Sequence, residues 1–417
     1  MNIPPSKSRR KLNMPPSSPP LTVPDDLTLE LLSLLPVKSL MRLRCVCRSW
    51  NALIYKPIFI ALSYLRVKSL VQLRCVCKSW SALISNPTFI KNHLKKSAQN
   101  PHIVLISVTD NFPSYFVVDS LPVSRLVENP LINLADDHHC GIKEENGIRV
   151  VGSCNGLLCL SSTQLISLIY VWNPATRQIS TKSGCYNFSW RTTEFAFGYD
   201  ISRDTYKVVA FFQDSRDVQV CSLGEDTWRN IQCFPKVCLP PHFRFDSGVY
   251  LSGTLNWLVV RNNNVNRDGS KLKVEHYVII SLDLGTETYT KLLPPRDFDQ
   301  VSLVESTICV LMDSLCFSHD SKGISLVIWK MVEFGVQKSW TQFFKICYHN
   351  LEIYDIHYRV VPLCLYGDTL ILVDYLDGRP ILYNWKNNKG MRTRITASKW
   401  WFYVNNYVES LVSTDGK

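Results

Sequence analysis

The residues from Val23 to Ile54 read VPDDLTLELLSLLPVKSLMRLRCVCRSWNALI and combine two helix patterns. Pro24 suits the first turn of a helix, Asp25 and Asp26 favour its positive N-terminal end, and Pro36 stops it after a leucine-rich run. Beyond Pro36 one apolar stripe recurs at steps of three and four residues, formed by Leu40, Leu43, Cys47, Trp50 and Ile54. The stretch therefore predicts a helical hairpin.

The second of these helices is repeated 30 residues later, because residues 37–60 and 67–90 are identical at 17 of 24 positions. The repeated stripe consists of Leu70, Leu73, Cys77, Trp80 and Ile84. Lys56 replaces Asp26 and Arg66 replaces Pro36, so the acidic start and the stop signal of the first helix are lost. We therefore expect a duplication whose second copy is truncated.

The segment 23–54 resembles the F-box, a helical module that docks on the Skp adaptor of cullin-RING ubiquitin ligases. The resemblance rests on the apolar-Pro opening, the Leu-rich first helix, the Leu-Pro pair and the Val-Cys-x-x-Trp that ends at Trp50. It implies that the following residues contact the adaptor: Pro24, Leu27, Leu31, Leu35, Pro36, Leu40, Val46, Cys47 and Trp50.

The duplication leaves two copies for one adaptor surface. We expect the first copy to dock because its connection is short, and long structureless insertions in compact units are uncommon. The alternative joins the first helix to the second copy and uses Leu70, Leu73, Cys77 and Trp80.

Positive charge is concentrated at the front of the chain. Residues 1–100 hold 16 of the 46 Lys and Arg but three of the 35 Asp and Glu, which leaves 30 bases against 32 acids in the remainder. A strongly basic surface attracts an acidic protein or a phosphate backbone. The adaptor's docking region is acidic in the F-box family, so the resemblance accounts for the charge. Nucleic-acid binding is the alternative.

From about residue 101 the sequence changes to short β-branched and aromatic runs, such as HIVLISV at 102–108 and YKVVAFF at 206–212. A turn followed by an alternating strand recurs, and so does a strand that ends in a polar turn, the latter every 50 to 60 residues or so. This spacing favours a β-propeller of five or six four-stranded blades, with a final blade built from both ends of the body. Two stacked sandwiches are the alternative.

Four phrases of the body resemble the F-box-associated, kelch-like domain of plant F-box proteins. They are GSCNGLLCL at 152–160, VWNPATRQ at 171–178, FGYDISRDTYKVV at 197–209 and LSGTLNWLV at 251–259. In that family the domain binds the protein to be ubiquitinated. The fold class predicted is thus α+β and multidomain, a small helical F-box followed by an all-β propeller.

Two possible chemical sites have simpler explanations. Cys154 fits the G-x-C-x-G pattern of a nucleophile elbow, but a strand instead of a helix is expected after it, so a hairpin turn is the better interpretation. Asp136–Cys140 gathers metal-capable side chains, yet adjacent residues point apart, and a solvated loop is expected. We predict no catalytic, cofactor or metal residue.

The sequence predicts four segments: a disordered basic tail at 1–20, the F-box at 21–62, a partial duplicate and linker at 63–100, and the β domain at 101–417. It lacks a secretory signal and a spanning run of about 20 apolar residues. We expect a cytoplasmic or nuclear, non-catalytic subunit of an SCF-type ligase, with the Skp adaptor, cullin, RING subunit and an unknown target protein as partners. Nucleic acid and membrane are not expected as partners.

Overall fold

The computed structural model divides the chain into two compact units, residues 1–65 and 66–417. The structure describes residues 62–109, 116–133, 143–144, 147–162, 167–180, 185–186, 193–212, 216–225, 227–235, 248–260, 274–296, 306–353, 360–374, 378–396 and 399–414. No helix among these residues combines the length and the apolar character needed to cross a bilayer.

The second unit begins with three short helices, α4 (Val67–Arg74), α5 (Lys78–Ile84) and α6 (Pro87–Ser97). Helix α6 starts because Asn86 caps it: the Asn86 side chain accepts a hydrogen bond of 2.9 Å from the Thr88 N–H, and Pro87 occupies the first turn. After α6 the described residues are mainly strands, as the sequence predicts.

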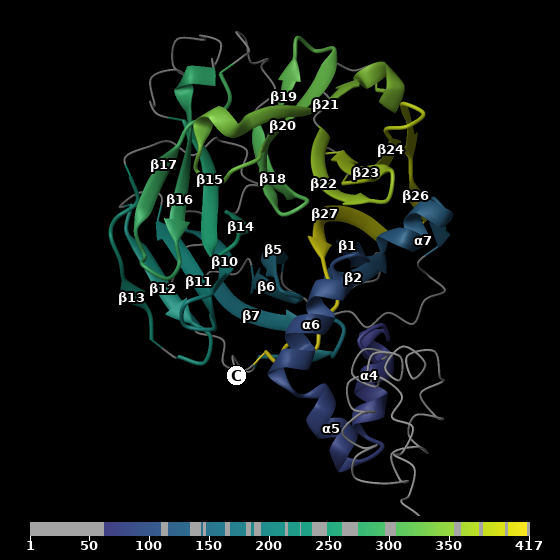
Figure 1. The fold of residues 1–417 in the computed structure, drawn as a ribbon, viewed down its shortest axis with the longest axis vertical. Helices are drawn as coiled ribbons and strands as arrows, with labels where there is room; N and C mark the ends of the chain where they lie inside the picture. The colour runs from purple at the N-terminus through teal and green to yellow at the C-terminus, as the bar shows by residue number, and fades with distance from the viewer. Residues whose placement is uncertain are drawn as a thin grey trace, which may run out of the picture. The chain divides into compact units, whose positions relative to one another are not determined.

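The strands form six antiparallel sheets, which we call blades 1 to 6 and which surround a common centre (Figure 1). Blade 1 contains β27 (Lys399–Tyr407), β1 (His102–Thr109), β2 (Phe116–Pro122) and β4 (Lys143–Glu144). Blade 2 contains β5 (Ile148–Cys154), β6 (Leu157–Ser162), β7 (Ser167–Asn173) and β8 (Gln178–Ile179), with β9 (Cys185–Tyr186) also paired to β7. Blade 3 contains β10 (Thr193–Asp200), β11 (Thr205–Phe212), β12 (Val218–Ser222) and β13 (Arg229–Asn230).

The other three blades follow in chain order. Blade 4 contains β14 (Val249–Leu251), β15 (Thr254–Val260), β16 (Tyr277–Asp283) and β17 (Tyr289–Leu292). Blade 5 contains β18 (Thr307–Leu311), β19 (Ser314–Ser321), β20 (Ser325–Met331) and β21 (Trp340–Cys347). Blade 6 contains β22 (Val360–Tyr366), β23 (Thr369–Asp374), β24 (Pro380–Asn384) and β25 (Lys389–Arg392).

A few elements lie outside the blades. Helix α7 (Val123–Glu128) follows β2, and β3 (Leu131–Asn133) pairs in parallel with β26 (Arg394–Thr396). Three 3₁₀ turns lie in connections: η2 (Val274–His276), η3 (Gln337–Ser339) and η4 (Tyr348–Leu351).

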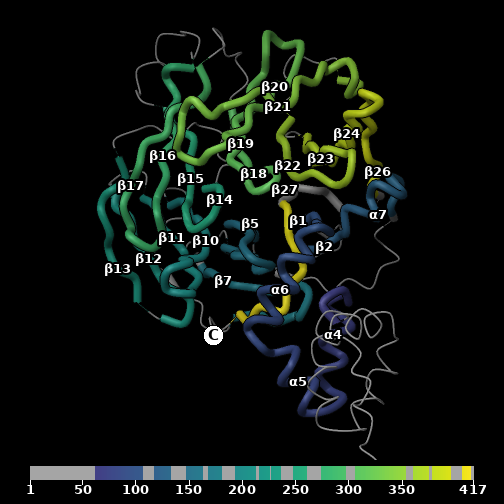
Figure 2. The backbone as a smooth tube through the Cα atoms, in the orientation of Figure 1, coloured from purple at the N-terminus to yellow at the C-terminus, as the bar shows by residue number. Residues whose placement is uncertain are grey.

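The two ends of the propeller meet in blade 1. Strand β27 pairs antiparallel with β1, with His102 opposite Tyr407 and Thr109 opposite Lys399. The tube in Figure 2 shows the C-terminal strand alongside β1. The prediction of a blade built from both ends of the body is confirmed, and this pairing closes the ring without leaving free first and last sheet edges.

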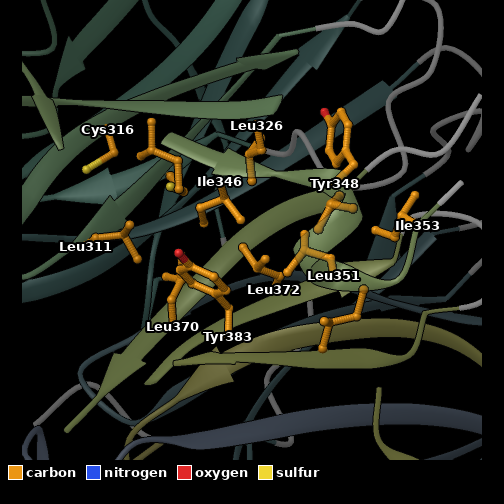
Figure 3. Close-up of a cluster of buried hydrophobic side chains, with 14 residues drawn as sticks. Leu311, Cys316, Leu326, Ile346, Tyr348, Leu351, Ile353, Leu370, Leu372 and Tyr383 are labelled. Carbon is orange, nitrogen blue, oxygen red and sulfur yellow. The ribbon is translucent and has the colours of Figure 1, made fainter. Parts of the chain in front are cut away.

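Each blade packs on the next through a buried apolar cluster, and these clusters follow the ring from blade 1 round to blade 6 and back. Between blades 5 and 6, Leu326 and Ile346 lie against Leu370, Leu372 and Tyr383 (Figure 3). The second strands β6 and β23 are buried along their whole length because each blade has two neighbours. The alternative of two stacked sandwiches is therefore wrong.

The two recurring sequence patterns correspond to two turns of the blade. The turn before an alternating strand is the two-residue hairpin between the first and second strands, as at Asn155–Gly156, Ser252–Gly253 and Met312–Asp313, where both residues have positive φ. The polar turn follows the third strand, as at Asn173 and Asp283, whose side-chain oxygens accept backbone N–H groups two and three residues on.

Candidate functional site

The nine adaptor-contact residues predicted in the first F-box copy, Pro24 to Trp50, lie outside the residues that the structure describes. The basic tail at 1–20 and the Asp136–Cys140 cluster also lie outside them. Only the second copy is therefore placed by the structure.

The second copy is not one helix. Helix α4 ends at Arg74, and Cys77 has an extended backbone (φ −160°, ψ 163°) from which α5 starts. The expectation of a single continuous stripe from Leu70 to Ile84 is wrong, because the Cys75-Val76-Cys77 run interrupts the helix with residues of low helix propensity. The apolar residues on the two sides of this break belong to different helices.

The four alternative adaptor residues of the second copy are not equally accessible. Leu70 is fully buried and Trp80 is 4% exposed, whereas Leu73 is half-buried and Cys77 is exposed. Val76, which corresponds to Val46 in the first copy, is 67% exposed. A partner that meets the second copy in this conformation reaches the loop between α4 and α5 but not Leu70 or Trp80.

The described helical segment is strongly basic. Residues 62–100 contain seven Lys and Arg and no Asp or Glu. Arg66, Lys68, Lys78, Lys91 and Lys95 are exposed. With no acid of its own to offset these charges, the segment presents a positive surface to an acidic partner.

Helix α6 is fastened to the propeller. Lys91 Nζ lies 3.2 Å from Asp204 Oδ1, and Asp204 also accepts a hydrogen bond from the Tyr199 hydroxyl. Asp204 belongs to the turn between β10 and β11 in blade 3. Because the Lys91–Asp204 pair is exposed, it contributes orientation more than stability.

Cys154 ends strand β5 and is followed by the Asn155–Gly156 turn and strand β6. The hairpin interpretation is thus confirmed. The Cys154 side chain is buried, and this burial raises the pKa of its thiol well above the usual range. A thiol that stays protonated is a poor nucleophile, so the geometry does not favour acyl transfer at this position.

The phrases around Gly156 and Asn173 hold the C-terminal segment. The buried Asn173 amide donates hydrogen bonds to the Ser410 carbonyl (3.1 Å) and the Val412 carbonyl (2.8 Å). Gly156 has a φ of +79°, and a Cβ there would lie 2.3 Å from the Ser410 side chain. These two residues therefore fasten the segment after β27 onto blade 2.

The phrase FGYDISRDTYKVV forms a buried ionic cluster between blades 3 and 4. The fully buried Lys207 Nζ lies 2.7 Å from Asp200 Oδ2 and 2.9 Å from Glu287 Oε1. Glu287, in the turn between β16 and β17, also pairs with Arg229. Hydrogen bonds from Arg229 and Lys207 lower the pKa of Glu287 to about 2. The cluster therefore links blade 3 to the β16–β17 turn of blade 4.

Sequence reasoning did not assign roles to Lys207, Glu287 or Ser410. The position of Lys207 inside the apolar run YKVVAFF could have indicated a buried ion pair, because Lys is almost never fully buried unless it is paired. Glu287 and Ser410 lie in ordinary polar turns, and nothing local distinguishes them. Within the described ranges no group of three or more His, Cys, Asp or Glu could hold a metal ion.

Comparison with known proteins identifies two domains of a single family on this chain. The model of the F-box associated beta propeller domain matches residues 107–414, and the model of the F-box domain matches residues 21–61 and 55–92. The second F-box match overlaps the duplicated copy.

Similar relatives come from Arabidopsis thaliana. An F-box/kelch-repeat protein is 27% identical over 89% of this chain and 90% of its own length. The F-box protein CPR1 is 27% identical over 78% of this chain and 73% of its own length. Among solved structures, TolB from Acinetobacter baumannii overlaps with a TM-score of 0.41 at 8% identity, over 74% of this chain and 66% of TolB. That overlap is too low to support any statement about function.

Proposed function

The chain belongs to the family of F-box proteins with an F-box associated β-propeller domain, and from this premise we propose that it is the substrate-recognition subunit of an SCF-type E3 ubiquitin ligase. In this proposal the F-box (21–62) docks on a Skp-type adaptor, which brings the cullin and RING subunits. The propeller (101–417) holds a target protein in the cytoplasm or nucleus. The single observation that carries the proposal is the presence of both family domains, in this order, on one chain.

We assign adaptor docking to the first F-box copy. The burial of Leu70 and Trp80 supports this choice, because the positions that correspond to Leu40 and Trp50 are already buried in the second copy. In the proposal the second copy acts as a spacer, with α4 to α6 joining the docking module to the propeller. The Lys91–Asp204 pair supports the spacer role.

The proposed mechanism is proximity. A target held on the propeller keeps its lysines beside the ubiquitin-conjugating enzyme, and this raises their effective concentration without any chemical step on this chain. The buried thiol of Cys154 and the structural use of the phrase residues around it are in line with a non-catalytic role.

The basic surface of α4 to α6 favours one alternative, a nucleic-acid-associated propeller. Seven bases without an acid in residues 62–100 would suit a phosphate backbone. Stacking on bases requires exposed aromatic rings, and in this segment Trp80 and Phe89 are buried while Tyr64 alone is exposed. Retention of the full chain on a DNA column that falls steeply with salt would favour this alternative.

The test exploits equivalent positions in the two copies. The variants Val46→Asp and Val76→Asp are compared for co-purification with a Skp-type adaptor. We expect Val46→Asp to abolish co-purification and Val76→Asp to leave it intact, because a charge in an apolar docking surface is costly without a partner. The double change Leu40→Glu with Trp50→Glu should have the same effect as Val46→Asp.

Val76 is a suitable control because its side chain is exposed, so Val76→Asp leaves the core of the chain intact. If Val76→Asp abolishes binding and Val46→Asp does not, the second copy docks and our assignment is wrong. If the wild-type chain is folded and binds no adaptor, the proposed function is wrong.

A further inference from the structure

Strand β21 is the longest outer strand among those that the structure describes. It has eight residues, whereas β8 and β13 have two each and β17 and β25 have four each. Within the described part of the chain, β21 pairs with β20 and with no other strand. A long outer strand leaves a row of backbone N–H and C=O groups that another strand can pair with.

The ladder between β20 and β21 shows which backbone groups face outward. The Tyr348 N–H donates to the Ile324 carbonyl at 2.9 Å, just beyond the end of the ladder. In an antiparallel pair, the backbone N–H and C=O groups of successive residues face alternately toward the partner strand and away from it. Ile346, two residues before Tyr348, therefore directs these groups toward β20, and Lys345 directs its own groups away from β20. The Lys345 N–H is therefore available to a strand added at the outer edge.

A β-bulge gives this edge an aromatic surface. The register shifts between Ile328 and Trp329, so that Phe343 is an extra residue in β21. The rings of Phe343 and Phe344 have centroids 4.3 Å apart, and the Phe344 ring lies 5.7 Å from Trp385 of blade 6. All three rings are half-buried. Bulges often re-aim side chains next to functional sites, and this one sets two neighbouring aromatic rings together.

Positive charge lies around the aromatic rings. Lys330 Nζ is 5.4 Å from the centroid of the Phe343 ring, and Lys345 is exposed on β21 itself. Val332, at the start of the loop that leads to β21, is 66% exposed. An extended segment carrying apolar and acidic side chains would match this edge in shape and in charge.

We propose that the outer edge of β21 is a target-binding site that takes an extended segment of the target by strand addition, with apolar side chains on Phe343, Phe344 and Trp385 and acidic side chains near Lys330 and Lys345. In this mode backbone hydrogen bonds provide affinity and side-chain contacts provide specificity. The inference rests on the proposed function, since it locates the target on the propeller.

A second copy of this chain is a poorer occupant of the same edge. Pairing of two β21 strands would bring Lys345 and Lys330 of both copies to one seam, and like charges across a strand pair are destabilising. The charge thus disfavours self-association and leaves an acidic segment as the complementary partner.

The experiment uses the full chain and a random library of displayed 12-residue peptides. Enriched peptides are synthesised, and their affinity is measured for the wild type, Lys345→Ala and Lys345→Pro. Both variants lose the charge, but only the proline variant also loses the outward N–H. Edge strands tolerate proline where the N–H faces outward. We expect enrichment of peptides with Asp or Glu beside apolar residues. Lys345→Ala should weaken binding a few-fold, and Lys345→Pro should weaken it about tenfold further, since tenfold corresponds to about 1.4 kcal/mol, in the range of a hydrogen bond.

Three results would overturn the inference: no enrichment from the library, equal affinity of Lys345→Pro and Lys345→Ala, or a wild-type dimer that Lys345→Pro dissociates. Thermal unfolding of both variants shows whether the proline has disturbed the fold, and Gln342→Pro then provides a second break on the same strand. Adaptor co-purification is measured on the same samples. If the wild-type chain binds the peptides as expected but does not co-purify with the adaptor, the proposed function is wrong and the β21 site is still supported.

Discussion

Blades 2 and 3 differ from blades 5 and 6 in how they are held. Blades 2 and 3 carry polar fastenings: Asn173 binds the C-terminal segment, and Lys207 joins Asp200 to Glu287. Blades 5 and 6 meet mainly through an apolar cluster, with one exposed hydrogen bond from Asn350 to Asn388, and among the described strands β21 pairs on one side only. The four phrases that resemble the family lie in blades 2 to 4, and those of blades 2 and 3 contain these polar contacts.

The largest expected effect comes from removing the buried charge between blades 3 and 4. Lys207→Met leaves Asp200 buried without its counter-ion, and breaking a buried pair by removing one partner costs about 3–5 kcal/mol. The midpoint of denaturant unfolding measures this. Lys291→Met, an exposed lysine of β17, is the control and should change the midpoint little. Equal effects of the two variants would mean that the cluster does not hold the blades.

The next prediction compares the loss of stability when a glycine is replaced by alanine in the turn between the first two strands of blade 2 and of blade 6. Gly367→Ala, with a φ of +52° and no atom within 4 Å of the added Cβ, should cost about 1 kcal/mol for the left-handed backbone. Gly156→Ala adds overpacking against Ser410 and should cost about 2–4 kcal/mol in all. Thermal unfolding of both variants checks the difference. Similar losses would show that the C-terminal segment is not held at Gly156.

A third comparison uses the polar turns after the third strands. Asn173→Ala loses the turn and both bonds to the C-terminal segment, so we expect about 2–3 kcal/mol. Asn384→Ala in blade 6 loses only its turn bonds to the Lys386 and Asn387 N–H groups and should cost about 1 kcal/mol. Hydrogen exchange of residues 408–414 should rise in Asn173→Ala alone. A rise in both variants would argue against the fastening.

A further expected effect is a pH dependence of stability. Arg229 and Lys207 lower the pKa of Glu287 from 4.5 to about 2, so its contribution is fully present above about pH 4.5 and is lost as the pH falls toward 2. The Glu287→Gln variant should therefore show a shallower loss of stability across this window than the wild type, in unfolding curves taken at a series of pH values. Parallel pH profiles would contradict the assignment.

Patterns in the sequence predicted much of this fold. The β-branched runs and their spacing follow from periodicity, because blades 2 and 4 repeat the same two turns, at Asn155–Gly156 and Ser252–Gly253 and after Asn173 and Asp283. The Leu70 to Ile84 stripe predicts one helix where the structure has two, because apolar periodicity does not reveal the helix break at Cys77. The β21 edge could not be predicted, since its bulge depends on how WTQFFKIC pairs with β20.

The central claim is that this chain links a target to a ubiquitin ligase through its F-box. The most direct test mixes the purified full chain with a purified cullin, with and without a Skp-type adaptor, and follows co-elution by size-exclusion chromatography. Our account predicts that the cullin elutes with the chain only when the adaptor is present. Separate elution of a folded chain in the presence of adaptor would contradict it.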